Sequence, residues 1–233
     1  MTTGADQALF DRSGWWDEDC RAFASLRALS SFRSALLARW LGDALREAVV
    51  IDLGCGGGLL SVPLARAGAR VLGVDLATQA LGVARQQGGE RLLAVRGDLE
   101  AAPVGDGVAD VVLLADVLEH VADPAAAVGE AVRLLRRGGH LFVNTINRTL
   151  RSRLFAITLG EGLGYIPRGT HCWRDFIRPA ELDAMASAAG CVRVRRVGEK
   201  PRLLATLQKG HIEVRETRDL AVGYGALYRK VAA

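Results

Sequence analysis

A glycine-rich loop and two further acidic residues stand where they could hold a nucleoside. The loop, Asp-Leu-Gly-Cys-Gly-Gly-Gly, spans Asp52–Gly58 and directly follows a short apolar run. Glycines in such a loop allow a tight turn and a close approach of a ligand to the backbone. Asp75 comes 21 residues after Gly54, and a carboxylate there can accept hydrogen bonds from both hydroxyls of a ribose. Asp98 follows the next apolar run and could meet the amino group of an adenine.

Asp116, Glu119 and His120 form a second group, with the residue types of a cation site. If this segment begins a helix, all three side chains share one face. Two carboxylates and an imidazole suit a divalent cation such as Mg²⁺. The alternative for Glu119 and His120 is a metal-free pair held by hydrogen bonds, and the choice stays open here.

His120 is also a candidate general base, and His171 is the second candidate. A base of this kind serves a reaction in which a hydroxyl must lose its proton. A lone histidine is more often structural than catalytic, so a structural role for His171 stands beside the catalytic one.

The elements that must position these residues follow from the hydrophobic pattern. Short apolar runs predict strands, and the segments between them have helical spacing and end at glycines. Strands are predicted at 48–53, 69–74, 92–96, 110–115 and 140–145, and helices at 59–67, 77–87 and 124–136. This alternation indicates a parallel sheet covered on both faces, with the ligand at the carboxyl ends of its strands.

The rest of the chain departs from this alternation. Residues 5–47 have the spacing of helices, and 147–178 mix leucines, arginines and glycines in what we predict to be a lid. A helix at 179–189, a strand at 192–197 and a strand pair within 203–230 complete the expected fold. We expect one domain over 1–233, with an N-terminal helical segment (1–47), a core (48–146), the lid insertion (147–178) and the rest of the sheet (179–233).

The spacing of the glycines favours a methyl donor over a dinucleotide. A dinucleotide loop has the pattern G-x-G-x-x-G, but here the third glycine comes one residue early, at Gly58, and position 59 is leucine. No second nucleotide-binding half follows residue 145. The pattern D-x-G-x-G-x-G matches the loop that binds S-adenosylmethionine. The residues expected to contact this donor are Asp52, Gly54, Cys55, Gly56, Gly58, Asp75, Leu76, Asp98 and Leu99.

Several short segments extend the match beyond the loop. They are Trp15-Trp16-Asp17, Gly73-Val-Asp75, Glu119–Pro124, Asn144–Arg148 and Pro167–His171. With these segments, the sequence resembles the class I S-adenosylmethionine-dependent methyltransferases. More narrowly, over about residues 5–230, it is similar to the ubiquinone-biosynthesis O-methyltransferase family.

The resemblance implies a fold and further site residues. The fold would be α/β: a Rossmann-like, mostly parallel sheet of seven strands with helices on both faces, plus N-terminal helices and the lid insertion. Arg33 and Ala115 match positions at which the family contacts the donor. The family's metal cluster is Glu-x-x-Glu-His, and Asp116 replaces its first glutamate here. Its acceptors are polyprenylated catechols, and its insertion is associated with lipid.

We therefore expect an S-adenosylmethionine-dependent O-methyltransferase acting on a phenolic or catecholic hydroxyl. A polyprenyl catechol of ubiquinone biosynthesis is the first acceptor. An aromatic natural product is an alternative, because the Ala, Arg and Gly bias suggests a GC-rich genome. A non-catalytic protein that binds S-adenosylmethionine is the competing class. The expected base is His120 or His171, with Mg²⁺ as the alternative means of activating the hydroxyl.

Charge and composition limit the partners. The net charge of +4 is too small to indicate a nucleic-acid partner, but residues 148–209 hold twelve of the Lys and Arg residues against five Asp and Glu. This basic segment is either a solvated face or a surface for anionic lipid. No apolar run is long enough to cross a bilayer, the first ten residues lack an apolar signal core, and no Cys-x-x-Cys pair occurs. We expect a cytoplasmic protein that contacts the membrane peripherally through 147–178; its oligomeric state is not predicted.

Overall fold

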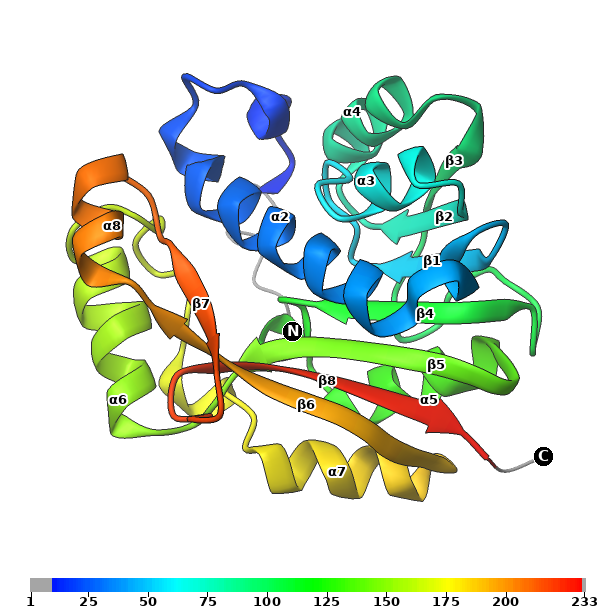
Figure 1. Cartoon of the computed structure of the whole chain (residues 1–233). Helices are drawn as coiled ribbons and strands as arrows, with labels where there is room; N and C mark the ends of the chain where they lie inside the picture. The colour runs from blue at the N-terminus through cyan, green and yellow to red at the C-terminus, as the bar shows by residue number, and fades with distance from the viewer. Residues whose placement is uncertain (1–9, 232–233) are drawn as a thin grey trace.

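A single eight-stranded sheet organises the described residues, 10–231, of the computed structural model (Figure 1). The strand order is β3-β2-β1-β4-β5-β8-β6-β7. The first five strands in chain order pair in parallel, and the last three are antiparallel to their neighbours. The strands are β1 (Val49–Leu53), β2 (Arg70–Asp75), β3 (Leu92–Arg96), β4 (Ala109–Ala115), β5 (Leu135–Ile146), β6 (Cys191–Pro201), β7 (Val214–Thr217) and β8 (Gly223–Lys230).

Helices cover both faces of this sheet, as Figure 1 shows. They are α2 (Arg21–Leu41), α3 (Ser61–Arg66), α4 (Thr78–Gly88), α5 (Pro124–Leu134), α6 (Leu150–Ser152), α7 (Pro179–Ala188) and α8 (Leu203–Lys209). A π-helix, η5 (Arg153–Glu161), continues α6. Short 3₁₀ turns lie at Gly14–Trp16 (η1), Gly42–Leu45 (η2), Gly89–Arg91 (η3), Leu118–His120 (η4) and Trp173–Asp175 (η6).

Two hydrophobic clusters hold the layers together. One joins the sheet to α5 and α7, and the other joins its opposite face to α2, α3 and α4. The central strand β4 is apolar throughout its buried length because side chains on both of its faces are covered. Helix α5 begins after Asp123, whose Oδ1 accepts the backbone N–H groups of Ala125 and Ala126 at 2.9 and 3.0 Å.

The predicted α/β class, the parallel core strands and the helices between them are confirmed. The sheet has eight strands rather than seven, because β7 adds a four-residue edge. The expected strand pair within 203–230 consists of β7 and β8, but each pairs with β6 and not with the other. Helix α8 was not predicted.

Several boundaries differ from the prediction: α3 covers 61–66 rather than 59–67, β5 covers 135–146 rather than 140–145, and β6 covers 191–201 rather than 192–197. Helix α2 begins at Arg21, because the chain before it runs as turns that set Trp15 and Trp16 on the glycine loop; residues 5–9 lie outside the described part. Helix α5 ends at Leu134, two residues early, because residues from Leu135 already pair with β4. The predicted lid contains α6, η5 and η6. No helix within residues 10–231 is both long and apolar enough to cross a membrane.

Candidate active site

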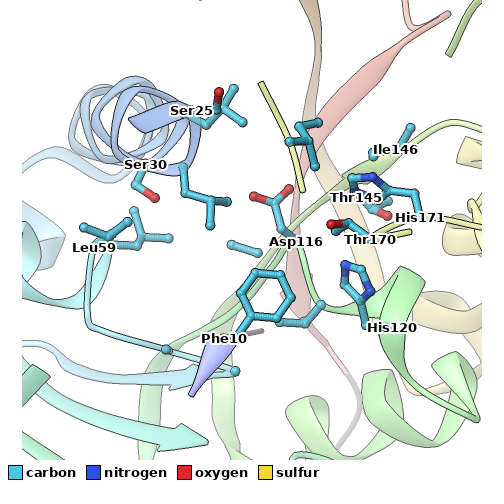
Figure 2. Close-up of a pocket in the computed structure, with 18 of the residues that line it drawn as sticks. Phe10, Ser25, Ser30, Leu59, Asp116, His120, Thr145, Ile146, Thr170 and His171 are labelled. Carbon is cyan, nitrogen blue, oxygen red and sulfur yellow. The ribbon is translucent and has the colours of Figure 1, made fainter. Parts of the chain in front are cut away.

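A cavity of about 460 Å³ lies at the carboxyl ends of β1, β2 and β4, bounded by α2 and the segment after β5. This is where ligands bind in open parallel sheets. Figure 2 shows Asp116 pointing into it, with His120 and His171 close together on one side. Of the expected donor contacts, ten line this one cavity: Arg33, Asp52, Gly54, Cys55, Gly56, Asp75, Leu76, Asp98, Leu99 and Ala115.

The glycine loop needs its glycines for two reasons. Gly54 and Gly56 have φ of 77° and 49°, a region that disfavours side chains. At Gly57 a Cβ atom would lie 2.2 Å from Cγ of Trp15, which covers the loop. The indole of Trp16 donates to the carbonyl oxygen of Gly57 at 2.8 Å. The paired tryptophans therefore hold the loop in shape.

Gly58 is the exception among the expected donor contacts. It does not line the cavity. Its φ is 80°, and a Cβ atom there would lie 3.1–3.2 Å from side chains of Val62 and Ala84. Gly58 thus serves the close packing of the loop against α3 and α4.

Asp75 ends β2 and fixes the loop from the side. Its Oδ2 accepts the backbone N–H of Gly56 and its Oδ1 that of Ala77, both at 2.8 Å. Burial raises the pKa of Asp75, while these backbone bonds oppose the shift. Each carboxylate oxygen keeps a lone pair free, so the group can accept further hydrogen bonds.

Asp52 lies at the end of β1 and is almost completely buried. Its Oδ2 accepts a hydrogen bond from the hydroxyl of Ser61. Burial raises the pKa of Asp52 to about 6, although the bond from Ser61 opposes this shift.

Asp116 does not join Glu119 and His120, contrary to the expected cation set. The only helical turn here, η4, begins at Leu118, and Asp116 precedes it with a φ of 54°. This left-handed turn directs its carboxylate to Arg33, with which it forms an ion pair. The three side chains therefore do not share a helix face.

Arg33 stands at the centre of a buried polar network. Its Nε donates to Glu199 Oε1 at 3.2 Å, and one terminal nitrogen donates to Glu199 Oε2 at 3.0 Å. Asn144 donates to the same Oε1 at 2.6 Å. Burial alone would lower the pKa of Arg33, but Asp116 and Glu199 raise it above its ordinary value, so the guanidinium is charged. Burial raises the pKa of Glu199, opposed by Arg33 and Asn144.

His171 meets Glu119 and His120 in place of Asp116. One ligand atom from each of these three residues lies within 4.8 Å of the others. Oε2 of Glu119 accepts from Thr145 at 2.7 Å, whereas its buried Oε1 has no hydrogen-bond partner among residues 10–231. An acceptor left alone in the interior costs free energy unless a cation, water or donor reaches it.

His171 is held from behind by Glu161, at the end of η5. Oε1 of Glu161 lies 3.1 Å from Nδ1 of His171 and accepts the backbone N–H of the same residue at 2.9 Å. Oε2 accepts the backbone N–H of Gly169 at 2.7 Å. Burial alone would raise the pKa of Glu161, but these bonds lower it below its ordinary value. With a proton on Nδ1, the free Nε2 lone pair of His171 can accept another proton.

Sequence reasoning missed Glu161, Glu199 and Thr145. Glu199 meets Arg33 across 166 positions of the chain, and no local pattern marks such a contact. Glu161 had a local signal, an acidic residue ten positions before His171, but its role depends on the π-helix.

Known proteins resemble this chain along most of its length. Residues 51–143 match a methyltransferase domain family. The ubiquinone biosynthesis O-methyltransferase of Methylococcus capsulatus is 38% identical over 226 residues, which cover 94% of this chain and 91% of that one. The protein of the same name from Bordetella bronchiseptica is 42% identical over 183 residues, covering 76% and 74%.

Solved structures share the fold. Magnesium protoporphyrin IX methyltransferase of Synechocystis, with bound S-adenosylhomocysteine, superposes with a TM-score of 0.66 at 22% identity, covering 98% of this chain and 94% of that one. A SAM-dependent methyltransferase of Thermotoga maritima gives 0.70 at 22% identity, covering 97% and 99%.

Proposed function

The chain belongs to the ubiquinone biosynthesis O-methyltransferase family, and we propose that it methylates a phenolic hydroxyl of a polyprenyl catechol. It is an S-adenosylmethionine-dependent methyltransferase. One observation carries the choice of an oxygen acceptor. Two imidazoles, His120 and His171, line the same cavity as the glycine loop and Asp75, so a proton acceptor lies beside the donor site.

The donor site fits an adenosyl group. The loop would approach it through backbone atoms, Asp75 would hold the ribose, and Asp98, which lines the same cavity, would meet the base. When bound, the donor supplies an electrophilic methyl group on its sulfonium. The protein's task is to hold the acceptor oxygen in line with that methyl group, and such orientation can supply about 7–11 kcal/mol.

The acceptor must also lose a proton. A phenol has a pKa of about 10 and is mostly neutral at neutral pH. We place the proton on Nε2 of His171, because Glu161 holds the opposite ring nitrogen and leaves Nε2 free, or on His120 beside it. General bases of this kind contribute about 10²–10⁴-fold in rate.

A divalent cation is the alternative use of the same residues. Glu119, His120 and His171 would hold it, and the unpartnered Oε1 of Glu119 fits that role. Bound there, it would act as a Lewis acid that lowers the pKa of a catechol hydroxyl. Two imidazoles and one carboxylate suit a transition metal better than Mg²⁺, which prefers oxygen ligands.

We also propose that the lid contacts anionic lipid and that the protein is cytoplasmic and peripheral to the membrane. Leu150 and Leu154 are exposed and neighbour Arg151 and Arg153 in the sequence, and Leu163 is exposed further along the lid. Helix α8 adds three exposed leucines: Leu203, Leu204 and Leu207.

The two leucine-bearing segments approach each other at one point of α2. Ser25 donates to the carbonyl oxygen of Tyr165, which follows η5, and accepts the backbone N–H of Ile212, which follows α8. Exposed leucines flanked by arginines suit a surface that dips into the headgroup region. A polyprenyl chain would reach the cavity from that surface.

A methyl-transfer assay tests the proposed function. The purified chain receives S-adenosylmethionine and either a prenylated catechol in vesicles or the same catechol without the tail. We expect O-methylated product from both, with the higher kcat/KM for the prenylated compound. Equal kcat/KM values would favour a soluble aromatic acceptor. No methylated phenol from either compound would overturn the proposal.

A further inference from the structure

The polar network around Arg33 extends to the edge of the cavity at Asp116, which the mechanism above does not use. The Asp116 side chain is 25% exposed, whereas those of Arg33 and Glu199 are 5% and 4% exposed. All three residues line the cavity. Asp116 is therefore the member of the network that a ligand can reach most easily.

The charges of this network suit a zwitterion. Both oxygens of Glu199 accept bonds from Arg33, and Oε1 also accepts from Asn144, so these bonds favour the ionised form of Glu199 against its burial. Two carboxylates then face one guanidinium, which leaves one negative charge in excess at the cavity edge. A cationic group of the ligand would balance this charge.

Hydrogen-bond accounting leaves capacity for both ends of an amino acid. Oδ2 of Asp116 accepts from Arg33, so Oδ1 can accept an ammonium. A guanidinium has five N–H donors, and three of those of Arg33 reach Glu199 and Asp116. The remaining two can serve a carboxylate.

We propose that Asp116 binds the α-ammonium of the donor's amino-acid end, next to Arg33 for its α-carboxylate, and that Glu199 is the positioning residue for Arg33. This inference rests on the proposed function, because it assumes an S-adenosyl donor in the cavity. It gives Asp116 a role toward the donor rather than toward a metal. The left-handed backbone of Asp116 serves this role, since it turns the carboxylate toward Arg33.

Donor analogues that lack the carboxylate, or both charged groups, distinguish the contact of Asp116 with the ammonium from that of Arg33 with the carboxylate. S-adenosylhomocysteine carries both the ammonium and the carboxylate, S-adenosyl-3-thiopropylamine carries only the ammonium, and methylthioadenosine carries neither. Calorimetric titration of each compound into the full chain measures binding without turnover. Asp116→Asn should weaken the first two by about 10- to 100-fold, the loss of one charge-assisted bond. It should leave methylthioadenosine within about two-fold.

Further variants complete the test. Arg33→Gln should weaken S-adenosylhomocysteine more than the amine, and Glu199→Gln should shift the three ligands in the same pattern as Arg33→Gln. Asp116→Glu, which keeps the charge, should recover part of the affinity. Glu216→Gln removes an acid from an exposed ion pair with Arg39 and serves as the matched control, with all three affinities unchanged.

Three results would overturn the inference. Asp116→Asn could weaken all three ligands equally, weaken none, or weaken them only when a divalent metal is present and not with a chelator. If the folded wild-type chain binds none of the three compounds, the proposed function itself fails. Melting curves of each variant identify loss of folding.

Discussion

Asp52 carries its carboxylate in the protein interior at the end of β1. Because its pKa is about 6 in the folded chain against 3.8 as its ordinary value, the folded state holds this proton more tightly than the unfolded state. As pH rises from 3.8 to 6 the unfolded chain ionises first, so this group lowers the free energy of unfolding. The full loss, about 3 kcal/mol, is present above pH 6.

Asp52→Asn cannot ionise and escapes this loss. We expect the free energy of unfolding of the variant, relative to wild type, to increase by up to about 3 kcal/mol between pH 4 and pH 7.5. Urea denaturation at both pH values measures this difference. The same difference at both pH values would mean that Asp52 is not destabilised by burial.

The two proposed roles of His171 and His120, general base and metal ligand, predict different experimental results. If one of them is the general base, we expect its substitution by glutamine, His171→Gln or His120→Gln, to lower kcat by about 10²–10⁴-fold. The affinity for S-adenosylhomocysteine should stay within about two-fold of wild type, because neither histidine is expected to hold the donor. Kinetics and calorimetry on the same preparations give both quantities.

Removal of metal ions with a chelator distinguishes the general-base mechanism from the metal mechanism. Dialysis against chelator should leave kcat unchanged on the base route. On the metal route it abolishes activity, and adding back Mn²⁺, Zn²⁺ or Mg²⁺ one at a time shows which ion restores it. Glu161→Gln gives a further contrast, because it should lower kcat on the base route even when chelator is present.

The glycine loop shows how an element shapes the site. Gly57 has an ordinary φ, but a Cβ atom there would overlap the indole of Trp15. Gly57→Ala should therefore displace Trp15 or the loop and weaken S-adenosylhomocysteine by at least about 10-fold. Calorimetry with a melting curve measures both effects.

Gly82→Ala is the matched control for that substitution. Gly82 lies within α4, and a Cβ atom there meets nothing within 4 Å. Alanine should raise helix stability by about 0.5–1 kcal/mol and leave donor affinity unchanged. Equal loss of affinity in Gly57→Ala and Gly82→Ala would contradict the account of the loop.

The elements also explain which parts of the site the sequence predicts. Parallel strands bring their carboxyl ends to one edge, so residues at or just after strand ends, such as Asp52, Asp75 and Asp98, could be grouped without a structure. Asp116 also follows a strand, but its backbone is left-handed rather than helical, and its carboxylate pairs with Arg33 instead of joining Glu119 and His120. Glu199 comes from the antiparallel strand β6, far along the chain, and only the folded molecule brings it to Arg33.

At the scale of the whole molecule, the exposed leucines of the lid and α8 are the surface that we propose binds the membrane. Changing Leu203, Leu204 and Leu207 to serine should lower co-sedimentation with phosphatidylglycerol vesicles at least about five-fold, since each buried leucine contributes about 1.5–3 kcal/mol. Arg151→Ala with Arg153→Ala should lower it too, and added salt should remove that part.

Leu93→Ser is the control, since Leu93 is 68% exposed on β3, the strand at the opposite edge of the sheet from β7. Vesicle binding should not change in this variant. Binding to phosphatidylcholine equal to that to phosphatidylglycerol would contradict the preference for anionic lipid, and no binding by wild type would leave the exposed leucines without a lipid role.

The central claim is that the donor binds on the glycine loop with its reacting end facing His120 and His171. A crystal structure of the chain with S-adenosylhomocysteine tests this claim most directly. We predict the adenosine on the glycine loop, both ribose hydroxyls on Asp75, and the sulfur facing the space bounded by His120 and His171. A ligand bound elsewhere, or a sulfur turned away from both histidines, would contradict the account.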